Sequence, residues 1–162
     1  MALHKTRIDI PAEKRTAIIG LLNDRLADLI NLMLQCKQAH WNVKGPHFIA
    51  LHELFDEQAG LIEEHVDTVA ERVTALGGTA EGTVALISKK SKLADYPVDI
   101  VTGPQHVNAL ASAFAETGKL VREAIDKADE LGDADAADIF TAASRELDKQ
   151  LWFLEAHLQA KE

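Results

Sequence analysis

The sequence KQAHWNVKGPHFIALHELFD occupies residues 37–56, and HVDTVAER follows at residues 65–72. The pair Gly45-Pro46 interrupts the first of these stretches, and such a pair ends a helix. On both sides of the break, apolar residues recur every three or four positions, as on the buried face of a helix. These stretches therefore predict two consecutive helices that carry histidines and carboxylates.

The same periodicity extends over most of the chain and predicts four long helices. Proline suits a first helical turn, and paired glycines or a Gly-Pro pair mark helix ends. Pro11 fits such a start, Gly77-Gly78 such an end, and Asp133 or Asp135 can cap the last helix. The first helix is expected to begin near Pro11, to show apolar periodicity from Ile18 and to end at about Val43. The others are expected at about 47–76, at 103–131, and from the cap at Asp133 or Asp135 to about residue 159.

The connection between the second and third helices is unusually long, from about residue 79 to residue 102, with a possible short helix at 84–87. A wholly antiparallel bundle needs only short turns, so this crossover predicts that the second and third helices run parallel. The expected fold is all-α, a ferritin-like four-helix bundle with a long crossover. We assign residues 1–10 to a short N-terminal tail and residues 11–162 to one bundle domain.

Composition narrows the possible functions. The formal net charge of −9 repels phosphates and suits a protein that attracts cations. Cys36 is the single cysteine, so no intrachain disulfide can form. The N-terminus does not read as a signal peptide, and no stretch approaches the roughly 20 apolar residues of a membrane span. A cytoplasmic protein is expected, with no membrane partner.

Four polar residues of the second predicted helix share one stripe. At about 100° per residue, His52 lies at 0°, Asp56 at about 40°, Asp67 at about 60° and Glu71 at about 100°. A solvated acidic face is the ordinary alternative. A histidine in such a face is unusual, however, and His40 ends the preceding helix, which favours a binding site.

The spacing along this stripe constrains any metal site. Asp56 and Asp67 are roughly 16 Å apart along a helix, whereas metal–oxygen bonds are near 2 Å. One ion therefore cannot bind both within one helix. If the helix packs antiparallel against its own copy, His52 and Asp56 of one chain face Asp67 and Glu71 of the other, and a two-fold axis makes this site twice.

The type of ligand also limits the metal. Imidazole and carboxylate without thiolate suit iron, manganese or zinc. A ferritin-type site inside the bundle would need Glu-x-x-His, and none of the seven histidines has a glutamate three positions earlier. The sequence therefore favours a metal site between subunits over one inside the bundle.

These motifs resemble the Dps family, the starvation-protection mini-ferritins. The resemblance extends from about residue 15 to residue 158. It is carried by His40-Trp41-Asn42, Gly45, Phe48, Leu51-His52-Glu53, Asp56, the stretch 65–72, Leu76-Gly77-Gly78, Asp138-Ile139-Phe140 and 148–152.

The resemblance implies a shell of twelve subunits that oxidises Fe(II), preferably with hydrogen peroxide, and stores an Fe(III) mineral. It places His40, His52 and Asp56 of one subunit against Asp67 and Glu71 of its mate. Asp56 and Glu71 would be the main anionic iron ligands, and zinc is a possible substitute for iron. Trp41, beside a ligand, is assigned either to core packing or to redox chemistry.

By the same resemblance, the start of the fourth helix lines a three-fold pore that admits Fe(II). Asp133 and Asp138 match acidic pore positions, although helix capping is the simpler interpretation. Where the family often has a further acid, this chain has Ala142. We expect Asp135 to be an exposed cap.

Two other functions stay open from sequence. One is a DNA-compacting, nucleoid-associated protein with secondary iron chemistry, but only Lys5 and Arg7 make the N-terminal tail basic. We therefore expect weak or absent DNA binding. The other is a cage with an inactive site, which the five intact site positions disfavour.

Overall fold

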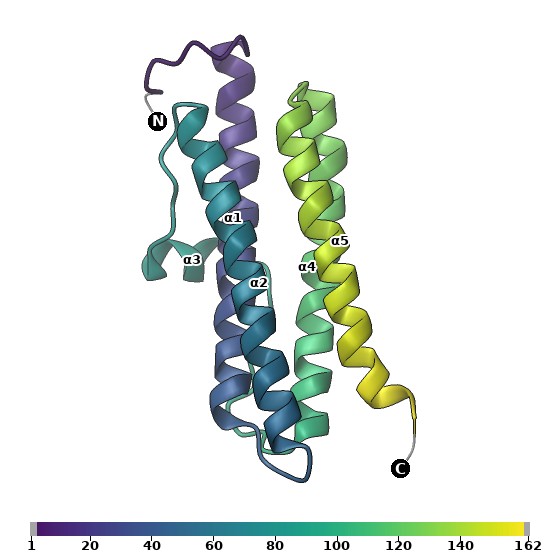
Figure 1. Cartoon of the computed structure of the whole chain (residues 1–162). Helices are drawn as coiled ribbons and strands as arrows, with labels where there is room; N and C mark the ends of the chain where they lie inside the picture. The colour runs from purple at the N-terminus through teal and green to yellow at the C-terminus, as the bar shows by residue number, and fades with distance from the viewer. Residues whose placement is uncertain (1–2, 161–162) are drawn as a thin grey trace.

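The structure is a computed structural model and describes residues 3–160. Its five helices are α1 (Ala12–Asn42), α2 (Phe48–Ala75), α3 (Val84–Lys90), α4 (Gly103–Leu131) and α5 (Ala134–Gln159). The four long helices form an elongated bundle, and the short α3 lies outside it (Figure 1). Among residues 3–160, no helix is long and apolar enough to cross a membrane.

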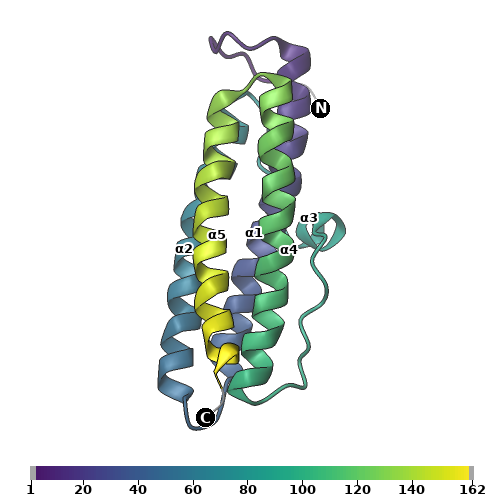
Figure 2. The ribbon, with the colours of Figure 1, turned by 90° about the vertical axis from the view of Figure 1, so that its right-hand side faces the viewer.

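The order of the helices in the bundle follows from the crossover. α1 runs antiparallel to α2, and α4 runs antiparallel to α5 (Figures 1 and 2). The crossover returns along the bundle past α3, so α2 and α4 run in the same direction, as the length of this connection predicted. A parallel bridge between Lys44 and Thr102 ties the end of the crossover to the α1–α2 loop.

The helix ends follow the local sequence signals. Gly77 has a positive φ of 88°, and the Gly77 and Gly78 amides donate to carbonyls of the last turn of α2. At the start of α4, Thr102 and Gln105 form a capping box. The predicted bounds of the long helices are confirmed to within a few residues, and α1 begins at Ala12, directly after Pro11, which was assigned to the first turn of this helix.

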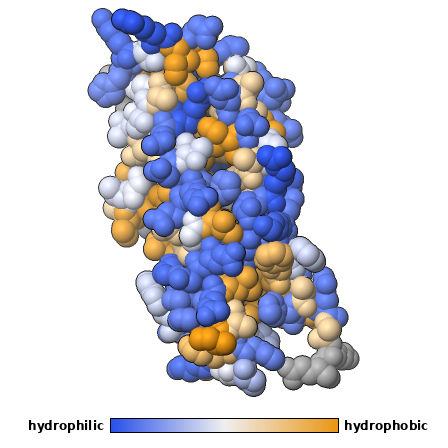
Figure 3. Space-filling model, viewed as in Figure 1, coloured by the Kyte–Doolittle hydropathy of each residue, from blue (hydrophilic) through white to orange (hydrophobic). Residues whose placement is uncertain are grey.

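The core is aliphatic with three central phenylalanines. Phe55, Phe114 and Phe140 are at most 1% exposed. Truncating any one of them to alanine would cost about 3–5 kcal/mol. Figure 3 shows a mostly hydrophilic surface with small hydrophobic groups between the polar side chains.

The described part of the N-terminal segment is packed against the bundle. The His4 amide donates to the Gly77 carbonyl at 2.8 Å, and Leu3, Ile8 and Ile10 pack against the core. Arg15 fixes the same corner, because its guanidinium donates to the carbonyl oxygens of Ile10 and Leu76. Residues 3–10, which belong to the segment assigned to a short N-terminal tail, therefore lie along the bundle, and residues 1–2 lie outside the described range.

One histidine belongs to the core. His106 is 1% exposed, and its Nδ1 lies 2.6 Å from the Tyr96 hydroxyl. Burial lowers the pKa of His106, since the charged imidazolium would lose its hydration. Neutral His106 is therefore part of the folded state.

We expect His106 to make stability depend on pH. As pH falls below about 6.5, the unfolded chain takes up a proton at this residue before the folded chain does, so folding weakens. His106→Asn keeps an acceptor for Tyr96 but cannot be protonated. The melting-temperature difference between wild type and this variant should shrink between pH 8 and pH 5.5.

His157→Asn, at an exposed histidine, is the matched control. A difference for His106→Asn that stays constant or widens toward low pH would contradict the assignment.

Candidate metal-binding site

Two histidines join the end of α1 to the start of α2. His40 lies in the last turn of α1 and His52 near the start of α2, and Gly45, with φ of 123°, helps the short loop reverse direction. His40 Nδ1 lies 2.7 Å from the His52 carbonyl oxygen, and His52 Nδ1 lies 2.8 Å from the His40 carbonyl oxygen. The rings stack with centroids 3.7 Å apart.

This reciprocal pairing decides which ring nitrogen is free. A carbonyl oxygen only accepts, so Nδ1 of each ring must carry the hydrogen and donate it. In the neutral imidazole the lone pair then belongs to Nε2. A metal-binding histidine is commonly held in this way, with its second nitrogen bonded to a carbonyl. The Nε2 atoms of His40 and His52 are therefore available as ligands.

Asp56 lies one turn after His52 and lines the same shallow groove as the two histidines. Its carboxylate pairs with the Lys37 ammonium group from α1. The hydrogen bond to Lys37, together with the positive charge of Lys37, lowers the pKa of Asp56. The carboxylate is thus ionised, and its main partner is the partly exposed Lys37 ammonium group.

Asp67 and Glu71 lie farther along α2, and both are exposed. Within residues 3–160 of one chain, no three His, Cys, Asp or Glu side chains come together to hold a metal ion. The structure thus places His40, His52 and Asp56 in one groove, but their ligand atoms do not come close enough to hold a single metal ion within residues 3–160. Whether a second chain supplies Asp67 and Glu71 stays a prediction.

Trp41 does not pack in the core of the chain. It is 65% exposed, and the Lys37 Nζ lies 5.9 Å from the centre of its ring. The assignment of Trp41 to core packing is therefore wrong for the single chain. Exposed Phe48 and Ile49 lie in the first turn of α2, so the histidine groove has apolar neighbours.

Known proteins are similar to this chain over nearly its whole length. A family model for the ferritin-like domain matches residues 19–162. A DNA protection during starvation protein of Agrobacterium fabrum is 52% identical over 161 residues, covering 99% of each chain. The chain belongs to the Dps family. The resemblance predicted from the motifs is thereby confirmed.

Solved Dps structures have the same fold. Mycobacterium smegmatis Dps superposes with a TM-score of 0.93 at 34% identity, covering 98% of this chain and 96% of that one. DpsA14 from Streptomyces coelicolor gives a TM-score of 0.92 at 35% identity, with 98% and 94% covered. The ferritin-like bundle predicted for this Dps chain is confirmed.

The acidic start of α5 has a structural role that the sequence left undecided. Asp133 is 2% exposed, caps α5 by accepting from the Ala136 amide at 3.1 Å, and pairs with the Arg72 guanidinium. Asp135, expected as an exposed cap, is exposed, but the cap is Asp133, and the Asp135 carboxylate lies 3.2 Å from the Arg72 guanidinium. Asp138 is exposed on the next turn. Of the two pore candidates in this Dps chain, only Asp138 presents a carboxylate to solvent.

Sequence reasoning missed Lys37 and Arg72 as partners of these carboxylates. A lysine three residues before His40, on the same helix face, was the available signal for the first. Nothing local could indicate the second, because Arg72 and Asp133 are 61 positions apart. Arg72 directly follows the proposed ligand Glu71. The ion pair between Arg72 and Asp133 also joins the end of α2 to the start of α5.

We expect Asp133 to matter for the stability of this Dps chain far more than Asp135. Asp133→Ala removes a helix cap and leaves the nearly buried Arg72 with only its exposed partner Asp135, which should cost about 2–4 kcal/mol. Asp135→Ala, the matched control at an exposed ion pair, should cost about 0–1 kcal/mol. Denaturant unfolding of both variants measures the difference, and equal losses would contradict the structural role.

Proposed function

We propose that this Dps protein is a ferroxidase that oxidises Fe(II), preferably with hydrogen peroxide, and stores the Fe(III) product. The observation that carries this proposal is the reciprocal His40–His52 pair beside Asp56. It presents two imidazole Nε2 atoms and an ionised carboxylate in one groove. Such nitrogen and oxygen ligands suit iron, manganese or zinc, and the family makes iron the substrate.

The half-site becomes complete in a two-fold pair of chains. With α2 antiparallel to its copy, His52 faces Glu71 of the partner subunit and Asp56 faces the partner's Asp67. Exposed Gly60 lies near the centre of this register and has no heavy atom near its missing Cβ within the chain. A glycine there lets two helices approach closely, which supports the shared site. Six such pairs make the proposed homododecameric shell.

The proposed reaction uses two Fe(II) ions and one hydrogen peroxide. Two electrons pass from iron to the peroxide, the O–O bond breaks, and two protons complete two water molecules. Asp56 and Glu71 favour the product because anionic ligands stabilise Fe(III) more than Fe(II). Lys37 releases Asp56 when the iron binds. His40 and His52 bind the iron more weakly than the carboxylates do, and Asp67 balances the charge of the site. Zinc can occupy the same ligands.

We assign the entry of Fe(II) to a negative surface around Asp138 at the start of α5. Asp133 is buried, so it stabilises the start of α5 through its cap and its ion pair with Arg72 and does not contact entering ions. Clustered negative charge raises the local concentration of cations, and the chain as a whole carries a net charge of −9. Trp41, exposed next to His40, is assigned to redox chemistry or to a subunit contact.

We also propose that the protein protects DNA chemically, in the cytoplasm, without binding it tightly. The relative from Agrobacterium is named for DNA protection. Here, residues 3–10 are packed on the bundle, so Lys5 and Arg7 are not displayed on a free tail. The acidic chain also repels phosphate. The alternative of a DNA-compacting, nucleoid-associated protein is therefore disfavoured.

The first test is peroxide-driven oxidation of Fe(II) by the purified assembly. Asp56→Ala should slow the initial rate by about tenfold or more, because it removes an anionic iron ligand. Asp126→Ala is the matched control, since Asp126 is exposed on α4 away from the groove. Equal rates for wild type and Asp56→Ala would exclude this groove as the oxidation site.

A mixed assembly tests whether two chains share the site. We expect Asp56→Ala and Glu71→Ala shells each to keep at most about a tenth of the wild-type rate. When the two variants assemble together at random, half of the two-fold pairs are mixed, and each mixed pair contains one intact site out of two. About a quarter of the wild-type rate should therefore return.

Mixing the two variants after assembly is the control and should restore nothing. If the site lay within one chain, the co-assembled mixture would be as inactive as its parents.

Gel retardation of duplex DNA tests the alternative function. At about 0.15 M salt, where surface charges are screened beyond about 8 Å, we expect no shift of the DNA by the assembled protein. Lys5→Ala/Arg7→Ala should behave as wild type. Tight binding that persists at this salt and weakens in the double variant would instead favour the DNA-compacting function.

A further inference from the structure

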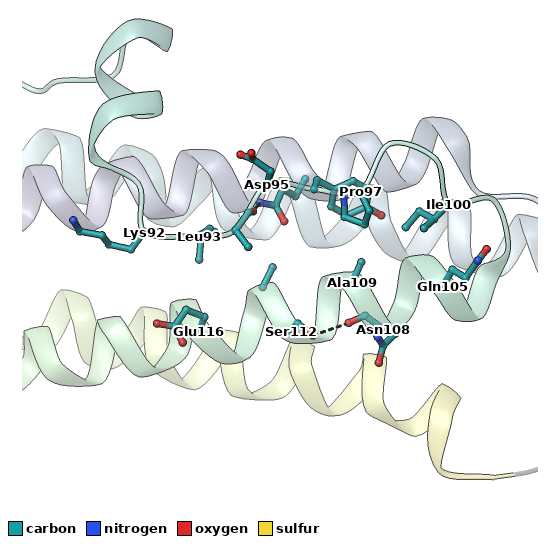
Figure 4. Close-up of a pocket in the computed structure, with 14 residues that line it drawn as sticks. Lys92, Leu93, Asp95, Pro97, Ile100, Gln105, Asn108, Ala109, Ser112 and Glu116 are labelled. Atoms are coloured by element: carbon teal, nitrogen blue, oxygen red, sulfur yellow. Dashed lines mark hydrogen bonds between the residues drawn. The ribbon is translucent and has the colours of Figure 1, made fainter.

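A cavity lies between the crossover and α4, away from the metal half-site. Its volume is about 630 Å³, within the range of small-molecule pockets. Figure 4 shows the crossover residues Leu93, Pro97 and Ile100 on one side and Ala109 of α4 on the other. None of its lining residues lines the histidine groove. The cavity is therefore a separate feature of the chain.

The wall formed by the crossover is held in place by hydrogen bonds. The Lys92 amide donates to Asp28 at 2.7 Å, and the Lys44 amide donates to the Val101 carbonyl at 3.0 Å. Between these two points, the Gln35 amide nitrogen donates to the Ala94 carbonyl at 3.0 Å. A wall fixed at three points does not need to order itself when a ligand binds, which lowers the cost of binding.

Gln35 supplies an acceptor in the lining. The residue as a whole is 5% exposed. The Ala94 carbonyl can only accept, so the amide nitrogen must face it, and Oε1 is the remaining polar atom of the side chain. Oε1 is not one of the fully buried side-chain atoms without a partner in residues 3–160, so it is open to the cavity. A ligand N–H group in the cavity could donate to it.

The charges of the lining exclude anions. Asp95 and Glu116 are carboxylates and Lys92 is the single cationic residue among the lining side chains. Within the described chain, neither Asp95 nor Lys92 forms an ion pair, and Glu116 has only a 3.9 Å contact with Lys119. The lining thus carries a net negative charge, in a chain whose formal charge is −9. A neutral or cationic ligand fits these charges.

We propose that this cavity binds a small aromatic amine. The apolar side chains and the half-buried ring of Tyr96 would pack against the aromatic body, and Gln35 would accept a hydrogen bond from the nitrogen. Tyr96 is itself held by His106, so its ring does not move freely. A bound ligand would bridge the crossover and α4, and the assembly would melt at a higher temperature.

N-phenyl-1-naphthylamine, a neutral fluorescent aromatic amine, is a suitable probe of the assembled protein. We expect saturable binding of one probe per chain. Ala109→Phe places a ring inside the cavity and should weaken binding by about tenfold or more. Ala115→Phe, at an exposed alanine of the same helix, should leave binding unchanged.

Anilinonaphthalenesulfonate has the same ring skeleton with an added negative charge. It should bind the wild type more weakly than the neutral probe, and Glu116→Gln should reduce that difference. If Ala109→Phe fails to assemble, Ser112→Phe fills the cavity from the next turn of α4. The proposal would be overturned if the probe did not bind the wild type saturably. It would also be overturned if the probe bound the wild type and the cavity-filled variants equally.

Discussion

The reciprocal hydrogen bonds between His40 and His52 connect the fold of this protein to its chemistry. Each ring donates to the backbone carbonyl of the other residue, so the pair fastens the end of α1 to the start of α2. The His40 carbonyl lies in the last turn of α1, where carbonyls have no partner within the helix. The same bonds leave both Nε2 atoms free, so the corner of the bundle and the proposed metal half-site depend on one interaction.

Asp56 and Asp133 each form an ion pair with a basic side chain, but the two pairs differ in burial. Asp56 is exposed and paired with the partly exposed Lys37, which a metal ion would displace in the proposed function. Asp133 is nearly buried and held by Arg72, whose guanidinium also reaches Asp135. The difference in burial separates the two roles, because an exposed pair exchanges readily whereas breaking a buried pair leaves a charge without compensation. One carboxylate therefore suits binding and the other suits structure.

The crossover has two consequences for the molecule. It makes α2 and α4 parallel, which places the α1–α2 loop and the start of α4 at the same end of the bundle (Figure 1). It also covers the side of α4 with a segment that is not helical. Side-chain and backbone bonds from α1 fix this segment at a distance from α4, and the space between them is the cavity.

The sequence by itself determined the helices and the ligand stripe. Helical periodicity and the Gly and Pro signals are local, so the bounds of α2 and α4 were predictable to within a residue or two. The positions of His52, Asp56, Asp67 and Glu71 on one face also follow from helix geometry alone, as does the distance that keeps Asp56 and Asp67 apart within one chain.

Only the tertiary structure decided which side chains meet. The pairing of Arg72 with Asp133, the docking of residues 3–10 and the contact of Tyr96 with His106 depend on how helices and connecting segments pack. Such contacts join residues distant in sequence or lying in irregular segments, where no periodicity reports them. The exposure of Trp41 was undetermined for the same reason: whether an apolar side chain at the end of a helix is covered depends on what packs over that end.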